Sequence, residues 1–238
     1  MKTIKFFLLS AAALFFATSC IDDFTIHGNG IEATEGRLTT TFNKVKSEGA
    51  FDVHITQGNK REVVITAESN ILPYIEADIN AHTLRIHVRG LHNIKNRLPM
   101  QVYVTTPHLV GVVQSGSGIV TTDFFESDDF DAVVSGSGRI ETAVNTHSIN
   151  AIVSGSGTLY LAGDAFDSDF AVSGSGRIEA LDFEVRDCDA KISGSGNIWT
   201  KVERYLSAAI SGSGNVYYHG SPSIETHISG SGKVIPEK

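Results

Sequence analysis

Aliphatic residues recur at fixed distances from seven copies of the tetrapeptide Ser-Gly-Ser-Gly in the second half of the chain. The copies begin at residues 115, 135, 154, 173, 193, 211 and 229, so their spacings are 20, 19, 19, 20, 18 and 18 residues. Two positions after each copy the residue is aliphatic: Val120, Ile140, Leu159, Ile178, Ile198, Val216 and Val234. Polar residues alternate with these columns, as expected for strands whose successive side chains point to opposite faces. A repeat this regular predicts a solenoid whose units stack on one another.

The repeat length predicts the shape of the unit. About 19 residues at roughly 3.3 Å each make a coil with a perimeter near 60 Å, stacked about 4.8 Å from the next coil. We therefore predict an all-β fold, a parallel β-helix or similar β-solenoid with about seven coils over residues 115–238. The motif would form a corner with its glycines inside and its serines in outward ladders, the alternative being a serine-rich binding strip. Cys188 lies five positions before its motif, in a column that includes Phe130, Ile149 and Leu206 and also points inward, which predicts a buried, unreactive thiol.

Residues 37–114 lack the motif but keep the alternation typical of strands. Residues 51–58, 62–67, 83–88 and 100–105 alternate in this way, and residues 70–75 fit one short helical turn. We expect a less regular β region that begins or caps the same solenoid, so that residues 37–238 form one domain.

The first 19 residues are typical of a secretory signal. Lys2 and Lys5 flank the start of an apolar run over residues 6–16, which is too short to span a bilayer stably. The run ends in Ala17-Thr18-Ser19-Cys20, which resembles the cleavage box of bacterial lipoproteins. We expect cleavage after residue 19 and lipidation of Cys20; an ordinary signal peptide with an incidental cysteine is the alternative.

Residues 20–36 are expected to hold the lipidated cysteine and a flexible tether. Asp22-Asp23 resembles the export signal that sends lipoproteins of Bacteroidetes-type bacteria to the outer surface. The predicted location is therefore the outer membrane of the cell envelope, facing outward rather than toward the periplasm. The formal net charge of −8 argues against nucleic acid as a partner, because phosphate binding needs a basic surface.

Several segments together resemble a known family. They are Phe51-Asp52-Val53, residues 55–58 (Ile-Thr-Gln-Gly), residues 83–86 (Thr-Leu-Arg-Ile), and residues 104–107 (Val-Thr-Thr-Pro) leading into the motif series. Over about residues 40–235 the chain resembles the auto-transporter adhesin family with a head GIN domain, a domain of unknown function. The resemblance implies adhesion and carries over no catalytic residue.

The chain contains no recognisable catalytic or metal-binding motif. It has no G-x-S-x-G, H-E-x-x-H, P-loop or C-x-x-C, and its nine histidines are scattered. We therefore predict no enzyme activity, no cofactor and no metal. Acidic turns near residues 128–131, 164–169 and 182–189 fit polar turn capping, with calcium binding as the alternative. Glu141 and Glu179 would lie about two coils, roughly 10 Å, apart on one outer face, which fits a row of solvated carboxylates, with a pair for glycoside cleavage as the alternative.

The candidate binding residues lie three positions after each motif, on the outward side. This column consists of Thr121, Glu141, Tyr160, Glu179, Trp199, Tyr217 and Ile235. Tyr160, Trp199 and Tyr217 would be near neighbours, with Tyr218 beside them and Glu179 between. Aromatic rings on a rigid β face suit stacking on sugar rings or packing on a protein, although they also stabilise a solenoid as a ladder.

Three functions follow from these patterns. The first is a non-catalytic, lipid-anchored surface module that binds glycan, host or matrix ligands as an adhesin. The second is a structural or accessory envelope lipoprotein that binds a protein partner. The third is a polysaccharide-active enzyme, since β-helices also carry such activities, although a fold alone licenses little.

Overall fold

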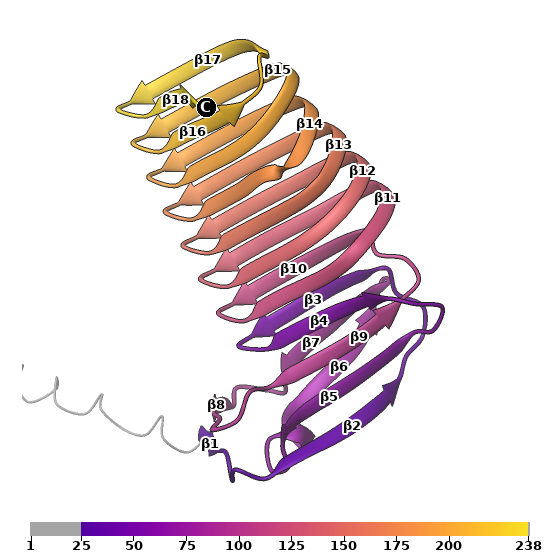
Figure 1. Cartoon of the computed structure of the whole chain (residues 1–238). Coiled ribbons are helices and arrows are strands. Elements are labelled where there is room, and N and C mark those ends of the chain that lie inside the picture. Colours follow the sequence, from indigo (N-terminus) through magenta and orange to yellow (C-terminus); the bar gives the residue numbers. More distant parts are fainter. Residues whose placement is uncertain (1–24, 238) are drawn as a thin grey trace, which may run out of the picture.

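The structure, a computed structural model, describes residues 25–237 and is built almost entirely of β-strands. A stack of coils forms the C-terminal part, and a less regular β region closes its N-terminal end (Figure 1). Sixteen strands belong to one continuous sheet, while β1 and β8 pair separately. Within residues 25–237, no helix has the length and apolar character needed to cross a bilayer. The predicted β-solenoid is confirmed.

The coils are made of long strands that run through the far side of each coil and end at the motif corners. Their bounds are β10 (Gly111–Gly116), β11 (Ile119–Gly136), β12 (Arg139–Gly155), β13 (Thr158–Gly174), β14 (Arg177–Gly194), β15 (Asn197–Gly212), β16 (Asn215–His219), β17 (Ser223–Gly230) and β18 (Lys233–Pro236). Equivalent strands of successive coils pair in parallel, up to β17 and β18 in the last coil.

Each coil is flattened between two faces. We call the strand segments before the motifs the leading face (residues 149–153 in one coil) and those after the motifs the trailing face (residues 158–162). The two faces meet at the motif corner and at a second, less regular turn, the far corner. The predicted inward column is in register from coil to coil, and Val120, Ile140 and Leu159 are fully buried between the faces.

The motif corner depends on close backbone contact between coils. Gly155 has a φ of 113°, and a Cβ added there would lie 2.6 Å from the carbonyl oxygen of Gly136 in the preceding coil. That same oxygen accepts the N–H groups of Ser156 and Gly157, both at 2.9 Å. The corresponding pair of hydrogen bonds recurs at Gly49, Gly155, Gly174, Gly194 and Gly212. Glycine is therefore required both for its backbone angle and for the absence of a side chain.

The solenoid begins before the first motif. Strands β3 (Lys44–Gly49) and β4 (Asp52–Gln57) form a coil on which β10 and β11 stack in parallel. Gly49 has a φ of 134° and takes the place of the first motif glycine, so this corner needs only one glycine of the tetrapeptide. Beneath this coil lie β7 (Thr83–Val88) and β9 (Gln101–Thr106), again in parallel.

Antiparallel strands then close the N-terminal end. Strand β5 (Glu62–Glu68) pairs with β9, and β6 (Ile75–Asn80) pairs with β7. The short 3-10 helix η3 (Leu72–Tyr74) joins β5 to β6 and confirms the helical turn predicted in residues 70–75. Because the added strands run against the direction of the coils, the parallel stack ends here.

The predicted tether over residues 20–36 is wrong from residue 25 onward. Strand β1 (Thr25–His27) pairs with β8 (Asn93–Lys95), and β2 (Glu32–Leu38) pairs antiparallel with β5. Polar contacts hold this segment: the buried Glu68 carboxylate accepts the N–H groups of Gly30 at 2.5 Å and Arg97 at 2.7 Å. An apolar pattern could not reveal such contacts. The predicted signal peptide, Cys20 and Asp22-Asp23 lie outside the described residues.

Cys188 occupies the inward column of the leading face, as predicted. Its thiol is buried, and this burial raises its pKa to about 12. A thiol in this environment stays protonated near neutral pH and is a poor nucleophile.

A substitution in the motif corner tests the role of its glycine. In Gly155→Ala, the methyl group meets the Gly136 carbonyl and the residue must hold a positive φ, so the free energy of unfolding should fall by about 1–3 kcal/mol. Chemical denaturation measures this loss. The matched change Ser156→Ala, at an exposed position of the same corner, should leave the unfolding free energy within about 0.5 kcal/mol of the parent. Equal losses in the two variants would contradict the proposed role of the glycine.

Candidate functional site

The outward column predicted after the motifs is one continuous row on the trailing face. Successive strand pairs place its members directly opposite one another, in the order Thr121, Glu141, Tyr160, Glu179, Trp199, Tyr217 and Ile235. The row therefore places two glutamates and three aromatic residues on the outside of one flat face, with a threonine and an isoleucine at its ends.

Two of the predicted aromatic residues stack on each other. The rings of Trp199 and Tyr217 lie 4.9 Å apart between centroids, with an interplanar angle of 9°. Tyr160 is two coils away, and Glu179 lies between it and Trp199. The prediction that Tyr218 joins this row is wrong, because successive strand residues point to opposite faces and Tyr218 packs against the core.

A groove surrounds Tyr160 on the trailing face. Its volume is about 540 Å³, and its lining residues are Thr121, Thr122, Glu141, Thr142, Ala143, Tyr160, Leu161, Ala162, Glu179, Leu181 and Asp182. Tyr160 is 38% exposed, and the Arg139 guanidinium lies 5.4 Å from its ring centroid. The buried Thr142 and Leu161 lie at the bottom of the groove. The groove thus offers one aromatic ring, several hydroxyl groups and three carboxylates.

The two glutamates beside Tyr160 have different environments. Glu141 is exposed and forms an ion pair with Arg139 at 3.1 Å, whereas Glu179 is half-buried and lies 3.8 Å from Arg177. Burial raises the pKa of Glu179 above its ordinary value, although Arg177 opposes this shift. Two coil spacings, about 10 Å, separate the two backbones. Both carboxylates can accept hydrogen bonds from a ligand that lies across Tyr160.

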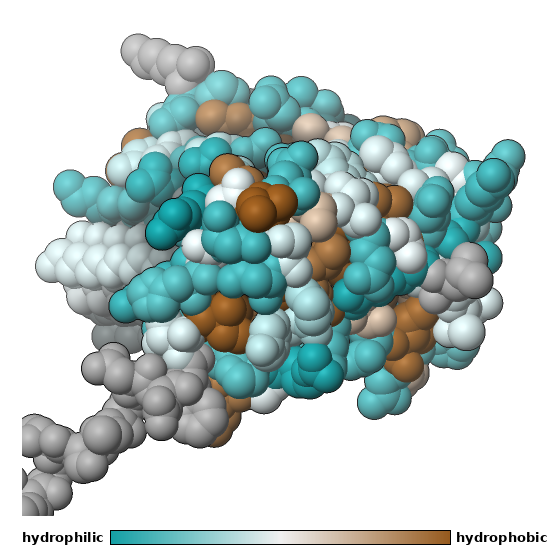
Figure 2. All heavy atoms as spheres, turned by 90° about the horizontal axis from the view of Figure 1, so that it is seen from below, coloured by the Kyte–Doolittle hydropathy of each residue, from teal (hydrophilic) through white to brown (hydrophobic). Residues whose placement is uncertain are grey.

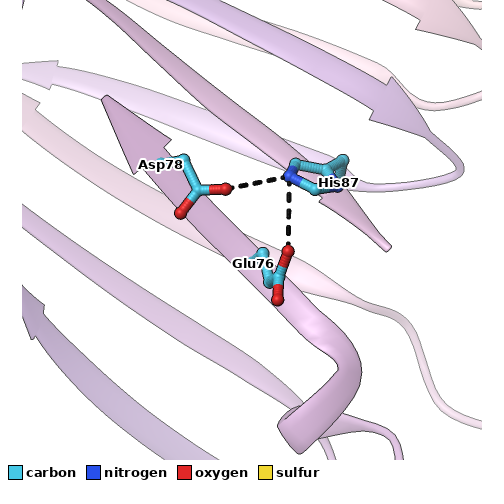
Figure 3. Close-up of side chains that lie close together, drawn as sticks. All are labelled: Glu76, Asp78 and His87. Carbon is cyan, nitrogen blue, oxygen red and sulfur yellow. Dashed lines mark hydrogen bonds and ion pairs between the residues drawn. The ribbon is translucent and has the colours of Figure 1, made fainter. Parts of the chain in front are cut away.

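A second group of polar side chains lies on the β6–β7 hairpin, away from the groove (Figure 3). The Nε2 atom of His87 is 3.1 Å from Oδ2 of Asp78 and 3.7 Å from Oε2 of Glu76. The three donor atoms lie within 4.8 Å of one another and have the chemistry of a divalent cation site. Arg89 already pairs with Glu76 at 3.5 Å, and Arg85 interacts with Asp78. Ion pairs therefore account for this cluster.

The acidic turns predicted from the sequence lie at and around the far corner. Several of their carboxylates have basic partners: Asp187 binds Arg204, and Asp169 lies 3.5 Å from Lys191. Arg204 also lowers the pKa of Asp187 through their hydrogen bond. These ion pairs link neighbouring coils.

Comparison with known proteins agrees with this architecture. Residues 41–222 match the family described as "Putative auto-transporter adhesin, head GIN domain". The chain belongs to this family. The match spans the β3–β4 coil, most of the antiparallel N-terminal strands, and all but the last coil of this head GIN domain. No curated protein matches the chain.

Solved structures share the fold of this head GIN domain. A protein described as a putative adhesin from Bacteroides fragilis has 24% identity and a TM-score of 0.83, covering 89% of this chain and 100% of its own. A protein from Parabacteroides distasonis described as a putative lipid binding protein has 23% identity and a TM-score of 0.77, with coverages of 90% and 100%. A putative adhesin from Parabacteroides merdae has 24% identity and a TM-score of 0.73, with coverages of 90% and 99%.

Sequence reasoning found the outward row but missed two features of the site. The groove lies where the trailing face approaches the far corner, its lining includes the small residues Ala143 and Ala162, and no repeat marks that corner. The cluster of Glu76, Asp78 and His87 was missed because its members are paired by an antiparallel hairpin rather than by spacing in the chain. The alternation of residues 83–88 gave the only signal for it.

The buried environment of Glu179 predicts how its loss affects stability. Because the folded-state pKa is raised, the ionised carboxylate costs stability at pH 7, and the cost disappears as the pH falls below the unfolded value of 4.5. Glu179→Gln should therefore unfold at a higher temperature than the parent at pH 7, with a smaller difference at pH 4. Glu141→Gln, at the exposed position two coils away, should change the midpoint little. A lower midpoint for Glu179→Gln at pH 7 would contradict this account.

Proposed function

We propose that this head GIN domain is a non-catalytic adhesin module that binds carbohydrate in the groove around Tyr160. The observation that carries the proposal is an exposed tyrosine ring between two carboxylates on a rigid face. An aromatic ring packs on the apolar face of a sugar, while carboxylates and threonine hydroxyls bind its hydroxyl groups. The site therefore combines the two kinds of contact that a hydroxyl-rich ligand needs.

The rigidity of the face favours this use. Every groove residue lies in or beside a strand that is paired on both sides, so ligand binding need not order a loop. The Trp199–Tyr217 pair continues the row beyond Glu179 and can contact a longer ligand. Many copies on one surface would then bind a repeating glycan much more tightly than one copy does.

The same proposal places the protein in the cell envelope. Cleavage before Cys20 and lipidation of that residue would anchor the chain a few residues before β1, in the outer membrane and facing outward. The Asp22-Asp23 pair after the cysteine supports the outward orientation.

A protein partner is the second candidate, and a different surface favours it. On the leading face, Val113, Val133, Ile152 and Ala171 form a half-exposed outward column in register. Such an apolar column suits a protein contact better than a sugar. An enzyme acting on polysaccharides is the third candidate, and it would rely on Glu141 and Glu179.

A glycan array tests the carbohydrate proposal. The chain from residue 21, which contains every described strand, should bind at least one class of glycan. Tyr160→Ala should weaken that binding about tenfold, because an aromatic contact contributes roughly 1–1.5 kcal/mol. The matched variant Tyr103→Ala removes an equally exposed ring outside the groove and should bind like the parent.

A Trp199→Ala variant separates the parts of the site. Weaker binding of long but not short glycans would extend the site to the stacked pair. Binding that survives Tyr160→Ala would contradict the groove, and the absence of any glycan binding would contradict a glycan adhesin.

Labelling with a radioactive fatty acid tests the anchor. The full chain, expressed in a bacterium with outer-membrane lipoprotein export, should incorporate the label. Protease added outside the cells should then degrade the labelled protein. Cys20→Ala should incorporate no label, because it removes the only thiol at the predicted cleavage site. Labelling of Cys20→Ala would refute the anchor, and protection of the labelled parent from protease would refute the outward orientation.

A further inference from the structure

The last coil of the solenoid exposes two positions that are buried in the coil beneath it. On β17, Ile224 is 41% and Ile228 is 44% exposed, whereas Leu206 and Ile210, which they cover, are 0% and 2% exposed. Within residues 25–237, β17 pairs only with β15, so its outer edge presents free backbone N–H and C=O groups. A flat edge with exposed isoleucines is a surface suited to pairing with another strand.

The two ends of the solenoid differ. At the N-terminal end, β2, β5 and β6 run antiparallel to their neighbours and cover the stack (Figure 1). Figure 2, which views this end, shows a mainly hydrophilic surface with separate hydrophobic areas. A second copy that stacked at this end would have to pair with the antiparallel edge strands β2 and β6 rather than with a coil. If two copies pair through the open end, they must do so with their C-terminal ends together, which closes the assembly at two.

The sequence of β17 is complementary to itself. Residues 223–229 read Ser-Ile-Glu-Thr-His-Ile-Ser, which is the same in both directions except that glutamate exchanges with histidine. In an antiparallel pair centred on Thr226, Ile224 lies opposite Ile228 of the partner subunit. Glu225 then lies opposite His227 of the partner subunit, where the imidazole can donate to the carboxylate.

Other registers of this pair are less favourable. A shift of two residues in one direction places Glu225 opposite Glu225 of the partner subunit, which repels. A shift in the other direction places the two copies of His227 opposite each other and breaks the pairing of the isoleucines. A shift of one residue turns the isoleucines to opposite faces. Of these registers, only the one centred on Thr226 places isoleucine opposite isoleucine and glutamate opposite histidine.

We propose that two copies of this chain pair end to end through β17, antiparallel, around a two-fold axis at Thr226. The pairing hydrogen-bonds the free edge and buries the exposed isoleucines of both copies. Strand β18 contributes less on the trailing face, because Pro236 has no N–H to donate.

The pair has its two N-terminal ends at opposite extremes. This arrangement follows from the two-fold axis, since β1 and the antiparallel strands β2, β5 and β6 lie at the opposite end of each copy from β17 (Figure 1). If Cys20 is lipidated, which rests on the proposed function, the anchors point in opposite directions and the pair joins two facing surfaces. The partner would then be a copy on a neighbouring cell or vesicle.

Sedimentation of the chain from residue 21 tests the pairing without the anchor, so a failure of lipidation and a failure of pairing are distinguishable. The parent should show a dimer that forms with increasing concentration, up to about 100 µM. Glu225→Arg and His227→Glu should each weaken the dimer at least tenfold, because the first removes the carboxylate that His227 of the partner subunit contacts and the second places two carboxylates opposite each other.

Mixing these two variants should restore the dimer, since the introduced arginine then faces the introduced glutamate and the other outer pair is again His227 with Glu225. Asp189→Arg, on the same outward column two coils away, is the matched control and should dimerise like the parent. A monomer at all concentrations, or a dimer that neither charge change weakens, would overturn the proposal.

A cysteine at the two-fold axis provides a second readout. Residues directly opposite in an antiparallel pair have Cα atoms about 4.5–5.5 Å apart, within reach of a disulfide. Thr226→Cys should therefore form a covalent dimer with the thiol oxidant diamide, which is reduced as the two thiols lose their protons and electrons. Asp189→Cys should stay mainly monomeric, and the buried Cys188 does not compete. Equal cross-linking of both variants would contradict the predicted axis.

Discussion

The structure depends on a single hydrogen-bonding arrangement, in which one glycine carbonyl accepts two N–H groups from the next coil. The carbonyl oxygen of Gly136 accepts hydrogen bonds from the N–H groups of Ser156 and Gly157, and the same arrangement recurs along the motif corner. It requires the backbones to approach so closely that any Cβ would collide with the neighbouring oxygen. Because this contact fixes the position of each coil on the previous one, it also aligns the inward aliphatic columns and the outward row.

The candidate site is a consequence of this alignment. Glu141, Tyr160 and Glu179 are about 19 residues apart in the chain, yet they lie on adjacent strands because each coil repeats the same register. No loop or hinge brings them together. A binding surface made in this way is as rigid as the core beneath it. Each coil contributes one residue to the row, so a single substitution changes the chemistry of the surface at one coil.

The repeated part of the fold could be predicted from the sequence for two reasons. One tetrapeptide marks each coil from residue 115 onward, and the aliphatic columns are spaced so that they point to the same side of the strands. The sequence also identified Tyr160, Glu179, Trp199 and Tyr217 as one row. The N-terminal part was harder to predict. Strand β2 is held by antiparallel pairing and by contacts to Glu68, which leave no apolar periodicity, and the coil of β3 and β4 keeps only Gly49 of the motif. Tyr218 was misplaced because adjacency in sequence was read as adjacency on one face.

The two corners of each coil tolerate change differently. Coil lengths vary between 18 and 20 residues, yet the motif corner stays in register throughout. The register shifts fall on the trailing face and at the far corner, as between Tyr160 and Ala162 and between Ala180 and Glu184. One edge of the molecule therefore sets the spacing of the stack, while the other can gain or lose residues without disturbing it. The groove borders this variable edge, so new recognition loops could be grafted there onto an unchanged frame.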